Sequence, residues 1–234
     1  MKLKLTPIYI LSFLCLSFFV MELHDWLHSA MAALLGGGWG PRGFDRWDFV
    51  SGTSVSSGER GLATIVGPLV NFLFIWAGWK KMGNRDSLAD QSLGCNLVLA
   101  ALPMDMIQGA LRSGGDLTVG LKLIFSHTHR IYPHLFGILG LLIILLICVP
   151  PLVRLFILLP SWGAKFLYFP IFLFVPMWLR HIVTHKLDDW LLRYEPDQSL
   201  AYAWVFFWTA ALLGGWFFTR RRLDDLLKDS ELPL

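Results

Sequence analysis

The chain has 234 residues, of which 55% are hydrophobic, 15% aromatic and only 16% charged, and its mean hydropathy is +0.56. This composition excludes an ordinary soluble domain and indicates a membrane protein. The net charge of +3 lies in loops and in the segment TRRRLDDLLKDS, a pattern typical of sequence that flanks a membrane. We therefore expect membrane lipid as a partner, and no nucleic acid.

Six windows are long and apolar enough to cross a hydrocarbon core of about 30 Å. They lie at residues 8–34, 61–79, 92–111, 133–152, 161–180 and 200–219. The loops between them are too short for a soluble domain. We predict an all-α membrane protein in which residues 1–234 form a single transmembrane domain, a polytopic helical bundle of about six transmembrane helices.

The first window follows Lys2 and Lys4 and could be taken for a signal peptide that ends near AMA at 30–32. A stretch of about ten partly charged residues separates the apolar core from AMA, which is too long and too polar for a cleavage region. We interpret the window as a membrane helix. The polar residues that it carries within two turns are Glu22, His24, Asp25 and His28.

With six spans, eleven of the twenty lysines and arginines lie on the side of the two termini, and nine lie on the other side. The positive-inside rule then predicts both termini in the cytoplasm. We expect an integral, multi-pass protein of the cell inner membrane. Cys15, Cys95 and Cys148 each lie in a different apolar run, which predicts buried free thiols and neither a disulfide nor a cysteine zinc site.

The stretch 36–60 is the longest predicted non-helical segment. Its glycines end the first helix, and FDRWDFV mixes apolar with charged residues between turn-rich flanks. We expect either a short β-hairpin or re-entrant loop here, or a flexible surface loop.

His24 and His28 are four residues apart, so their imidazoles leave one face of the helix about 40° apart and can bind one metal ion. Zinc hydrolases use this spacing in the pattern H-E-x-x-H, where the glutamate takes a proton from the attacking water. Here Asp25 takes the place of that glutamate, and its shorter stem withdraws the carboxylate by roughly 1 Å. Glu22 projects about 160° to 200° away from His24 and is a poor alternative.

The sequence HDWLHSAMAALLGG at 24–37 resembles the zinc-binding element of the site-2 protease family of intramembrane zinc metalloproteases. VGPLVN at 66–71 is similar to the Gly-Pro-x-x-Asn element of that family, and NLVLAALPMD at 96–105 is similar to the element whose aspartate completes the zinc site. The resemblance covers about residues 20–110. The chain departs from the family pattern at Asp25 and at Met106, where the family usually has glycine.

This resemblance implies an intramembrane zinc metalloprotease that hydrolyses peptide bonds of membrane-embedded substrates, such as a single-pass membrane protein. Zinc would be bound by His24, His28 and Asp105, with Asp25 as the catalytic base. Helix geometry is consistent, because His28 and Asp105 lie roughly 12 Å and 10 Å below the same membrane face. Asp116 is the alternative third ligand, although an aspartate after two glycines is typical of a helix N-cap.

Asn71 lies near 15 Å from that face, where it could hydrogen-bond a substrate backbone or a neighbouring helix, and we predict that it binds substrate.

Two other functions fit parts of the sequence. The first is a histidine-rich membrane metalloenzyme, an oxygenase or an amidase, built on His181 and His185. The residues that would extend this second group are Asp188, Asp189, His127, His129 and His134. The second is a non-catalytic protease relative that binds membrane segments, which the shorter side chain of Asp25 favours.

Overall fold

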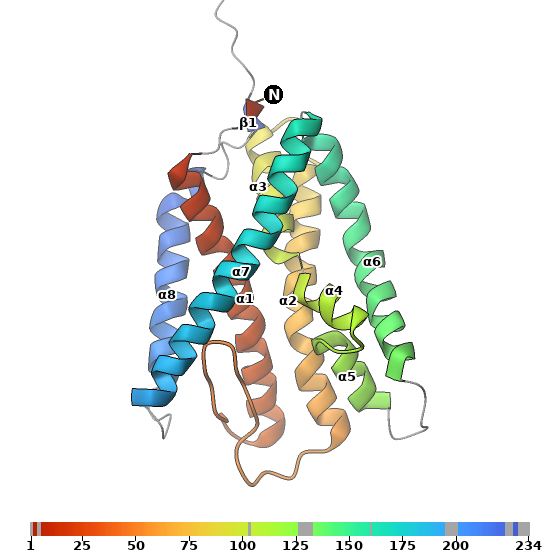
Figure 1. Cartoon of the computed structure of the whole chain (residues 1–234), viewed down its shortest axis with the longest axis vertical. Helices are drawn as coiled ribbons and strands as arrows, with labels where there is room; N and C mark the ends of the chain where they lie inside the picture. Colours follow the sequence, from red (N-terminus) through yellow and green to blue (C-terminus); the bar gives the residue numbers. More distant parts are fainter. Residues whose placement is uncertain are drawn as a thin grey trace, which may run out of the picture.

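The computed structural model describes residues 2–3, 6–102, 104–125, 133–159, 161–194, 201–222 and 227–228. The residues so described form eight α-helices, which confirms the predicted all-α bundle (Figure 1). The helices are α1 (Pro7–Gly36), α2 (Ser57–Met82), α3 (Leu88–Ala101), α4 (Met104–Leu111), α5 (Asp116–Phe125), α6 (Pro133–Leu158), α7 (Trp162–Tyr194) and α8 (Ala201–Thr219). A 3₁₀ turn, Arg220–Arg222, follows α8.

Five of these helices, α1, α2, α6, α7 and α8, are long and apolar enough to cross a membrane. The third predicted window, 92–111, is not one helix: it covers most of α3 and all of α4, and these two helices together with α5 run from one end of the bundle to the other (Figure 1). α3 ends where Leu102 adopts an extended conformation (φ −62°, ψ 122°), as expected for the residue before a proline, here Pro103. Between α4 and α5, Ser113 (φ 57°) and Gly115 (φ 75°) turn the chain.

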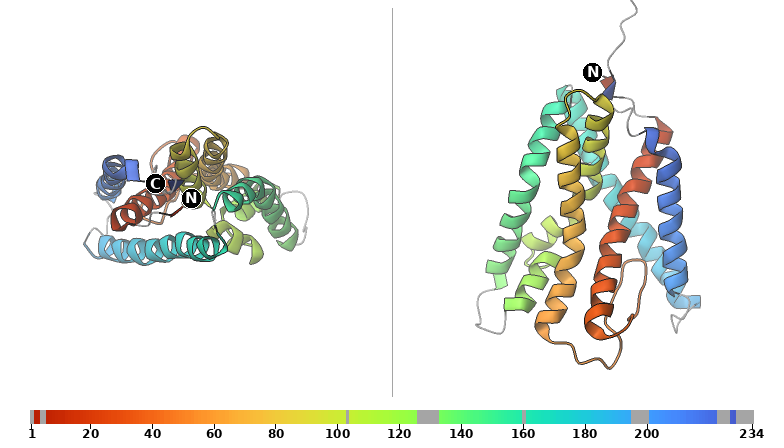
Figure 2. Two further views of the ribbon diagram at one scale, coloured as in Figure 1. Left: turned by 90° about the horizontal axis from the view of Figure 1, so that it is seen from above. Right: turned by 180° about the vertical axis from the view of Figure 1, so that it is seen from behind.

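Six passes return the chain to the end of the bundle at which it began. There β1 (Lys2–Leu3) pairs with β2 (Leu227–Lys228) as an antiparallel two-residue ladder. Helices α1 and α8 lie side by side in both figures, and α7 forms an outer layer that crosses the bundle obliquely (Figure 2). The two ends of the chain therefore lie on the same side of the bundle, as the six-span prediction requires.

The main apolar core lies between α1, α2, α3, α6 and α7 and includes Phe13, Ile75 and Ile144. Large apolar side chains on the outer faces of α6, α7 and α8 are exposed, which suits lipid contact. The three cysteines are free, as predicted.

A buried polar contact fixes one end of α7 to the rest of the bundle. The hydroxyls of Tyr9 in α1 and Tyr168 in α7 both donate hydrogen bonds to Oδ1 of Asn96 in α3, the second at 3.0 Å. Polar groups in lipid are stable only when they are paired inside the protein. These three side chains therefore hold α7 against α1 and α3.

Residues 37–56 fold back along α1 (Figure 1). Arg42 and Trp47 form an antiparallel bridge, and the Gly43 N–H donates to the Arg46 carbonyl at 2.9 Å, so this part of the loop is a tight hairpin. Of the alternatives expected for this stretch, the structure thus favours a short hairpin-like turn, closed by one bridge and without a regular strand. The Arg42 side chain is buried and pairs with Glu22 of α1 at 3.5 Å, which fastens the hairpin to the helix that carries the histidine pair.

Candidate metal centre

His24 and His28 lie one turn apart on the buried face of α1, and their Nε2 atoms are 3.0 Å from each other. The predicted sharing of one helix face is confirmed. Both imidazoles are almost completely excluded from the surface.

The Nδ1 atoms of both histidines contact oxygen atoms of α2. Nδ1 of His28 lies 2.7 Å from the carbonyl oxygen of Ala63, and Nδ1 of His24 lies 3.1 Å from Oδ1 of Asn71. An oxygen of this kind only accepts, so each Nδ1 carries the proton and donates it. In the neutral imidazoles the two Nε2 atoms then present lone pairs, as in histidines that ligate metals.

A third acceptor joins them from α5. Oδ2 of Asp116 lies 3.0 Å from Nε2 of His24 and 3.5 Å from Nε2 of His28. Asp116 is the first residue of α5, directly after the turn at Gly115, and its side chain is 40% exposed because it borders a cavity. Two imidazole lone pairs and a carboxylate repel one another at this separation unless a cation or a proton lies between them.

Asp25 completes a buried group of His24, Asp25 and His28 whose ligand atoms all lie within 4.8 Å of one another, and this group could bind a metal ion. Its carboxylate has a further partner: Nη2 of Arg180 in α7 lies 2.9 Å from Oδ2 of Asp25. Asp25 is therefore oriented by an arginine, whereas the Asp116 carboxylate points at both histidines. Glu22 contacts Arg42 and Trp208, away from the histidines, as its helix position predicts.

Two neighbours fix the ring of His28. The indole of Trp47, from the hairpin, stacks on the imidazole with ring centroids 4.8 Å apart and planes 9° apart. On α2, a Cβ atom at Gly67 would lie only 2.2 Å from Nε2 of His28. Glycine at this position of the VGPLVN element is therefore what lets α2 approach the imidazole.

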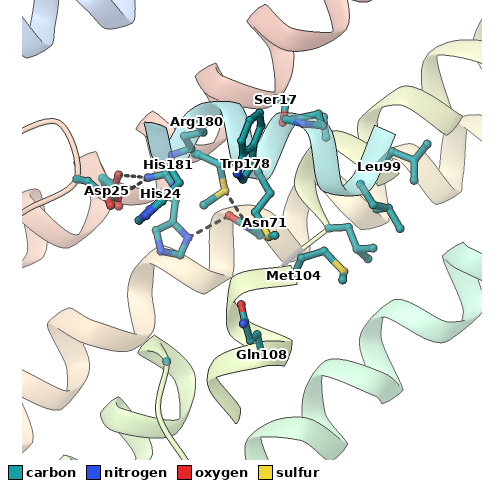
Figure 3. A pocket seen from close by; sticks show the side chains of 18 of the residues that line it. Ser17, His24, Asp25, Asn71, Leu99, Met104, Gln108, Trp178, Arg180 and His181 are labelled. Carbon is teal, nitrogen blue, oxygen red and sulfur yellow. Dashed lines mark hydrogen bonds and ion pairs between the residues drawn. The ribbon is translucent and has the colours of Figure 1, made fainter. Parts of the chain in front are cut away.

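The group borders a cavity of about 610 Å³ between α1, α2, the broken third pass and α7. Its polar lining includes His24, Asp25, Asn71 and Arg180 (Figure 3). Asp116 also lines it. Its apolar lining comes mainly from α3, α4 and α7, for example Leu99, Met104 and Phe172. Cavities of this size hold small ligands or short peptide segments.

The predicted roles of Asp105 and Asn71 are not decided by the described structure. The backbone of Asp105 lies in α4, but its side chain is outside the described part of the structure, so its role as third ligand stays a prediction. Asn71 lines the cavity and contacts His24 on the neighbouring helix, so its role in binding substrate also stays a prediction.

The second histidine group is less suited to bind a metal ion. His181 and His185 stack on each other, and His185 pairs with Asp189 at 3.8 Å, with both side chains about 60% exposed. Asp188 instead points into the hairpin and accepts the Phe44 N–H at 2.7 Å. His134 contacts Ser113, and His127 and His129 lie outside the described residues.

Sequence reasoning did not identify Arg180, Trp47 or Gly67 as parts of the site. Two of them had a signal: Gly67 belongs to the VGPLVN element, and an arginine inside an apolar helix, such as Arg180, is costly and marks function. Comparison of the chain with protein-family models, curated proteins and solved structures finds no match.

Proposed function

We propose that the protein is an intramembrane zinc metalloprotease that hydrolyses peptide bonds of membrane-embedded substrates. The observation that carries this proposal is the convergence of three acceptor atoms, Nε2 of His24, Nε2 of His28 and Oδ2 of Asp116, at separations of 3.0 to 3.5 Å. A divalent cation placed between these atoms would neutralise their mutual repulsion.

The donor set fits zinc. Zinc binds histidine nitrogens and carboxylate oxygens at about 2.0–2.2 Å, and tetrahedral ligands at that distance are roughly 3.3–3.6 Å apart. Two histidines and one carboxylate are the protein ligands of a common class of catalytic zinc site, which keeps a fourth position open for water. We therefore assign His24, His28 and Asp116 as the zinc ligands, with Asp105 as the alternative third ligand that the resemblance implied.

The role of Asp25 follows from its position beside the ligands. When bound, zinc acts as a Lewis acid toward the scissile carbonyl and makes a water molecule more acidic. Asp25 accepts a proton from that water and passes it to the nitrogen of the leaving amine, as general base and then general acid. The side chain of Asn71 and the carbonyl of Ala63 keep the two imidazoles in the Nδ1-protonated tautomer, which leaves each Nε2 available to bind zinc.

The parts played by the three sequence elements support the resemblance to site-2 proteases. The first provides His24, His28 and Asp25, and the second provides Gly67 beneath His28 and Asn71 beside His24. The third element lines the cavity through Leu99, Ala100 and other residues. A cavity that combines apolar side chains with polar groups beside the histidine pair suits a segment of a single-pass membrane protein.

The test is metal analysis of purified protein together with cleavage of a single-pass substrate. Wild type should contain about one zinc per chain, and His24→Ala combined with His28→Ala should contain none. Asp116→Ala should lose most of the zinc, whereas the matched variant Asp105→Ala should retain it. Zinc retained in the double histidine variant would refute the site, and the reverse result for the two aspartates would restore Asp105 as ligand.

A further inference from the structure

Arg180 of α7 reaches Asp25 across the cavity (Figure 3). Its Nη2 atom lies 2.9 Å from Oδ2 of Asp25 and 2.8 Å from Oδ1 of Asp45 in the hairpin. Building on the proposed function, we infer that Arg180 is a positioning residue for Asp25. The ion pair with Arg180 fixes the direction of the Asp25 carboxylate, because the side chain of Asp25 is one methylene shorter than that of glutamate.

The cost of placing Arg180 here argues for a specific role. Its side chain is 11% exposed, in a helix that is long and apolar enough to cross a membrane. An unpaired arginine at such a position is strongly unfavourable. The two carboxylates compensate this cost.

The arginine approaches from a helix whose position is fixed on both sides of it. Toward the N-terminus of α7, Tyr168 is hydrogen-bonded to Asn96. Toward its C-terminus, the buried carboxylate of Asp188 accepts the N–H groups of Phe44 and Asp45 at 2.7 and 3.2 Å. The hairpin that carries Asp45 is thereby attached to the same helix as Arg180. The position of Arg180 is thus supported by contacts of α7 and the hairpin in addition to its ion pair with Asp25.

The contact pattern suits positioning better than blocking. Among the described residues, Arg180 contacts Asp25 through one oxygen, Oδ2, so Oδ1 can accept a proton. A carboxylate on a short, rotatable stem would otherwise sample several directions. A misplacement of about 1 Å can reduce a rate roughly a hundredfold. Loss of the fixed direction of Asp25 should therefore lower the rate of cleavage substantially.

The experiment measures kcat, KM and zinc content for Arg180→Gln and Arg180→Lys, each with Asp25 and with Asp25→Glu. With Asp25, we expect Arg180→Gln to lower kcat about 10- to 100-fold, with KM and zinc nearly unchanged, because the arginine acts through the base. Lysine should restore part of the loss. In the Asp25→Glu background, the longer side chain reaches the water without help from Arg180. There Arg180→Gln should lower kcat less than about threefold.

Lys186→Gln is the matched control, because it removes a positive charge from an exposed position of the same helix and should leave kcat unchanged. Equal losses with aspartate and glutamate, or faster cleavage by Arg180→Gln, would overturn the positioning role. If Arg180→Gln does not fold, the comparison is made with Arg180→Lys. A zinc-loaded wild type that cleaves nothing would overturn the proposed function and this role together, whereas active wild type with a silent Arg180→Gln overturns only the latter.

Discussion

Hydrogen bonds made by two nitrogen atoms, Nδ1 of His24 and Nδ1 of His28, determine what this site can bind. Because both donate to oxygens of α2, both Nε2 lone pairs face the same point beside Asp116. Such an arrangement is unfavourable unless a cation or a proton lies between these groups. The i, i+4 spacing was sufficient to predict that the histidines share a face. The tautomers follow only from the packing of α2 on α1.

The role of Asp25 can be tested by a change of one atom. Asp25→Asn keeps the size of the side chain but removes a base that can accept a proton at neutral pH, so cleavage should fall about 10²- to 10⁴-fold. Zinc content should stay at the wild-type level, because the ligands are unchanged. Asp25→Glu should keep or raise activity. Metal analysis and cleavage of one substrate by the three proteins check this, and undiminished cleavage by Asp25→Asn would rule Asp25 out as the base.

Gly67 gives a second prediction at the residue scale. A Cβ atom there would lie 2.2 Å from Nε2 of His28, and the ring cannot move aside because Trp47 stacks on it and Nδ1 is bonded to Ala63. Gly67→Ala should therefore lower zinc affinity at least tenfold. Gly58→Ala, at the start of the same helix, places its Cβ in open space and should bind zinc like wild type. Competition with a chelator measures both affinities, and equal values would show that α2 can shift without affecting His28.

At the scale of elements, the broken third pass decides which aspartate meets the histidines. In the sequence, Pro103 and the two glycines before Asp116 indicate two breaks in the helix of the third pass. Neither signal gave the path of the turn, in which Ser113 and Gly115 adopt positive φ and direct Asp116 toward α1. A one-dimensional depth estimate placed Asp105 near His28, which stays a prediction, but it could not foresee the turn that brings Asp116 to the same two histidines. The spans themselves were predictable because long apolar helices have a strong sequence signal.

The close fit between α4 and this turn can be tested with a pair of glycines. A Cβ at Gly109 would lie 2.7 Å from Cα of Gly115, a backbone atom that cannot give way without moving Asp116. Gly109→Ala should therefore displace the third ligand and lower both zinc affinity and cleavage about tenfold or more. Gly114→Ala meets nothing closer than 3.7 Å and should have little effect. If the two variants bind zinc equally well, the turn does not position a ligand.

At the scale of the whole molecule, the site connects parts of the chain that are otherwise held by apolar contacts. The proposed ligands come from α1 and α5, the histidines are held from α2, and Asp25, the proposed base, is held from α7 through Arg180. The sequence could predict a bundle of six passes with both ends on one side. It could not predict that α7 and the hairpin meet at Asp25, because this contact joins segments more than 130 residues apart and has no local pattern.

A metal ion that joins α1 to α5 should stabilise the folded bundle. Zinc that binds only the folded state at 100 times its Kd contributes about 2.7 kcal/mol. For a chain of this length, that corresponds to a rise in Tm of roughly 5–10 °C. Stripping zinc from wild type in detergent should lower Tm by this amount, and adding zinc back should restore it. Asp25→Asn should show the same shift, because it keeps the ligands, whereas the double histidine variant should show none. A chelator effect of equal size in that variant would place the stabilising metal elsewhere in the chain.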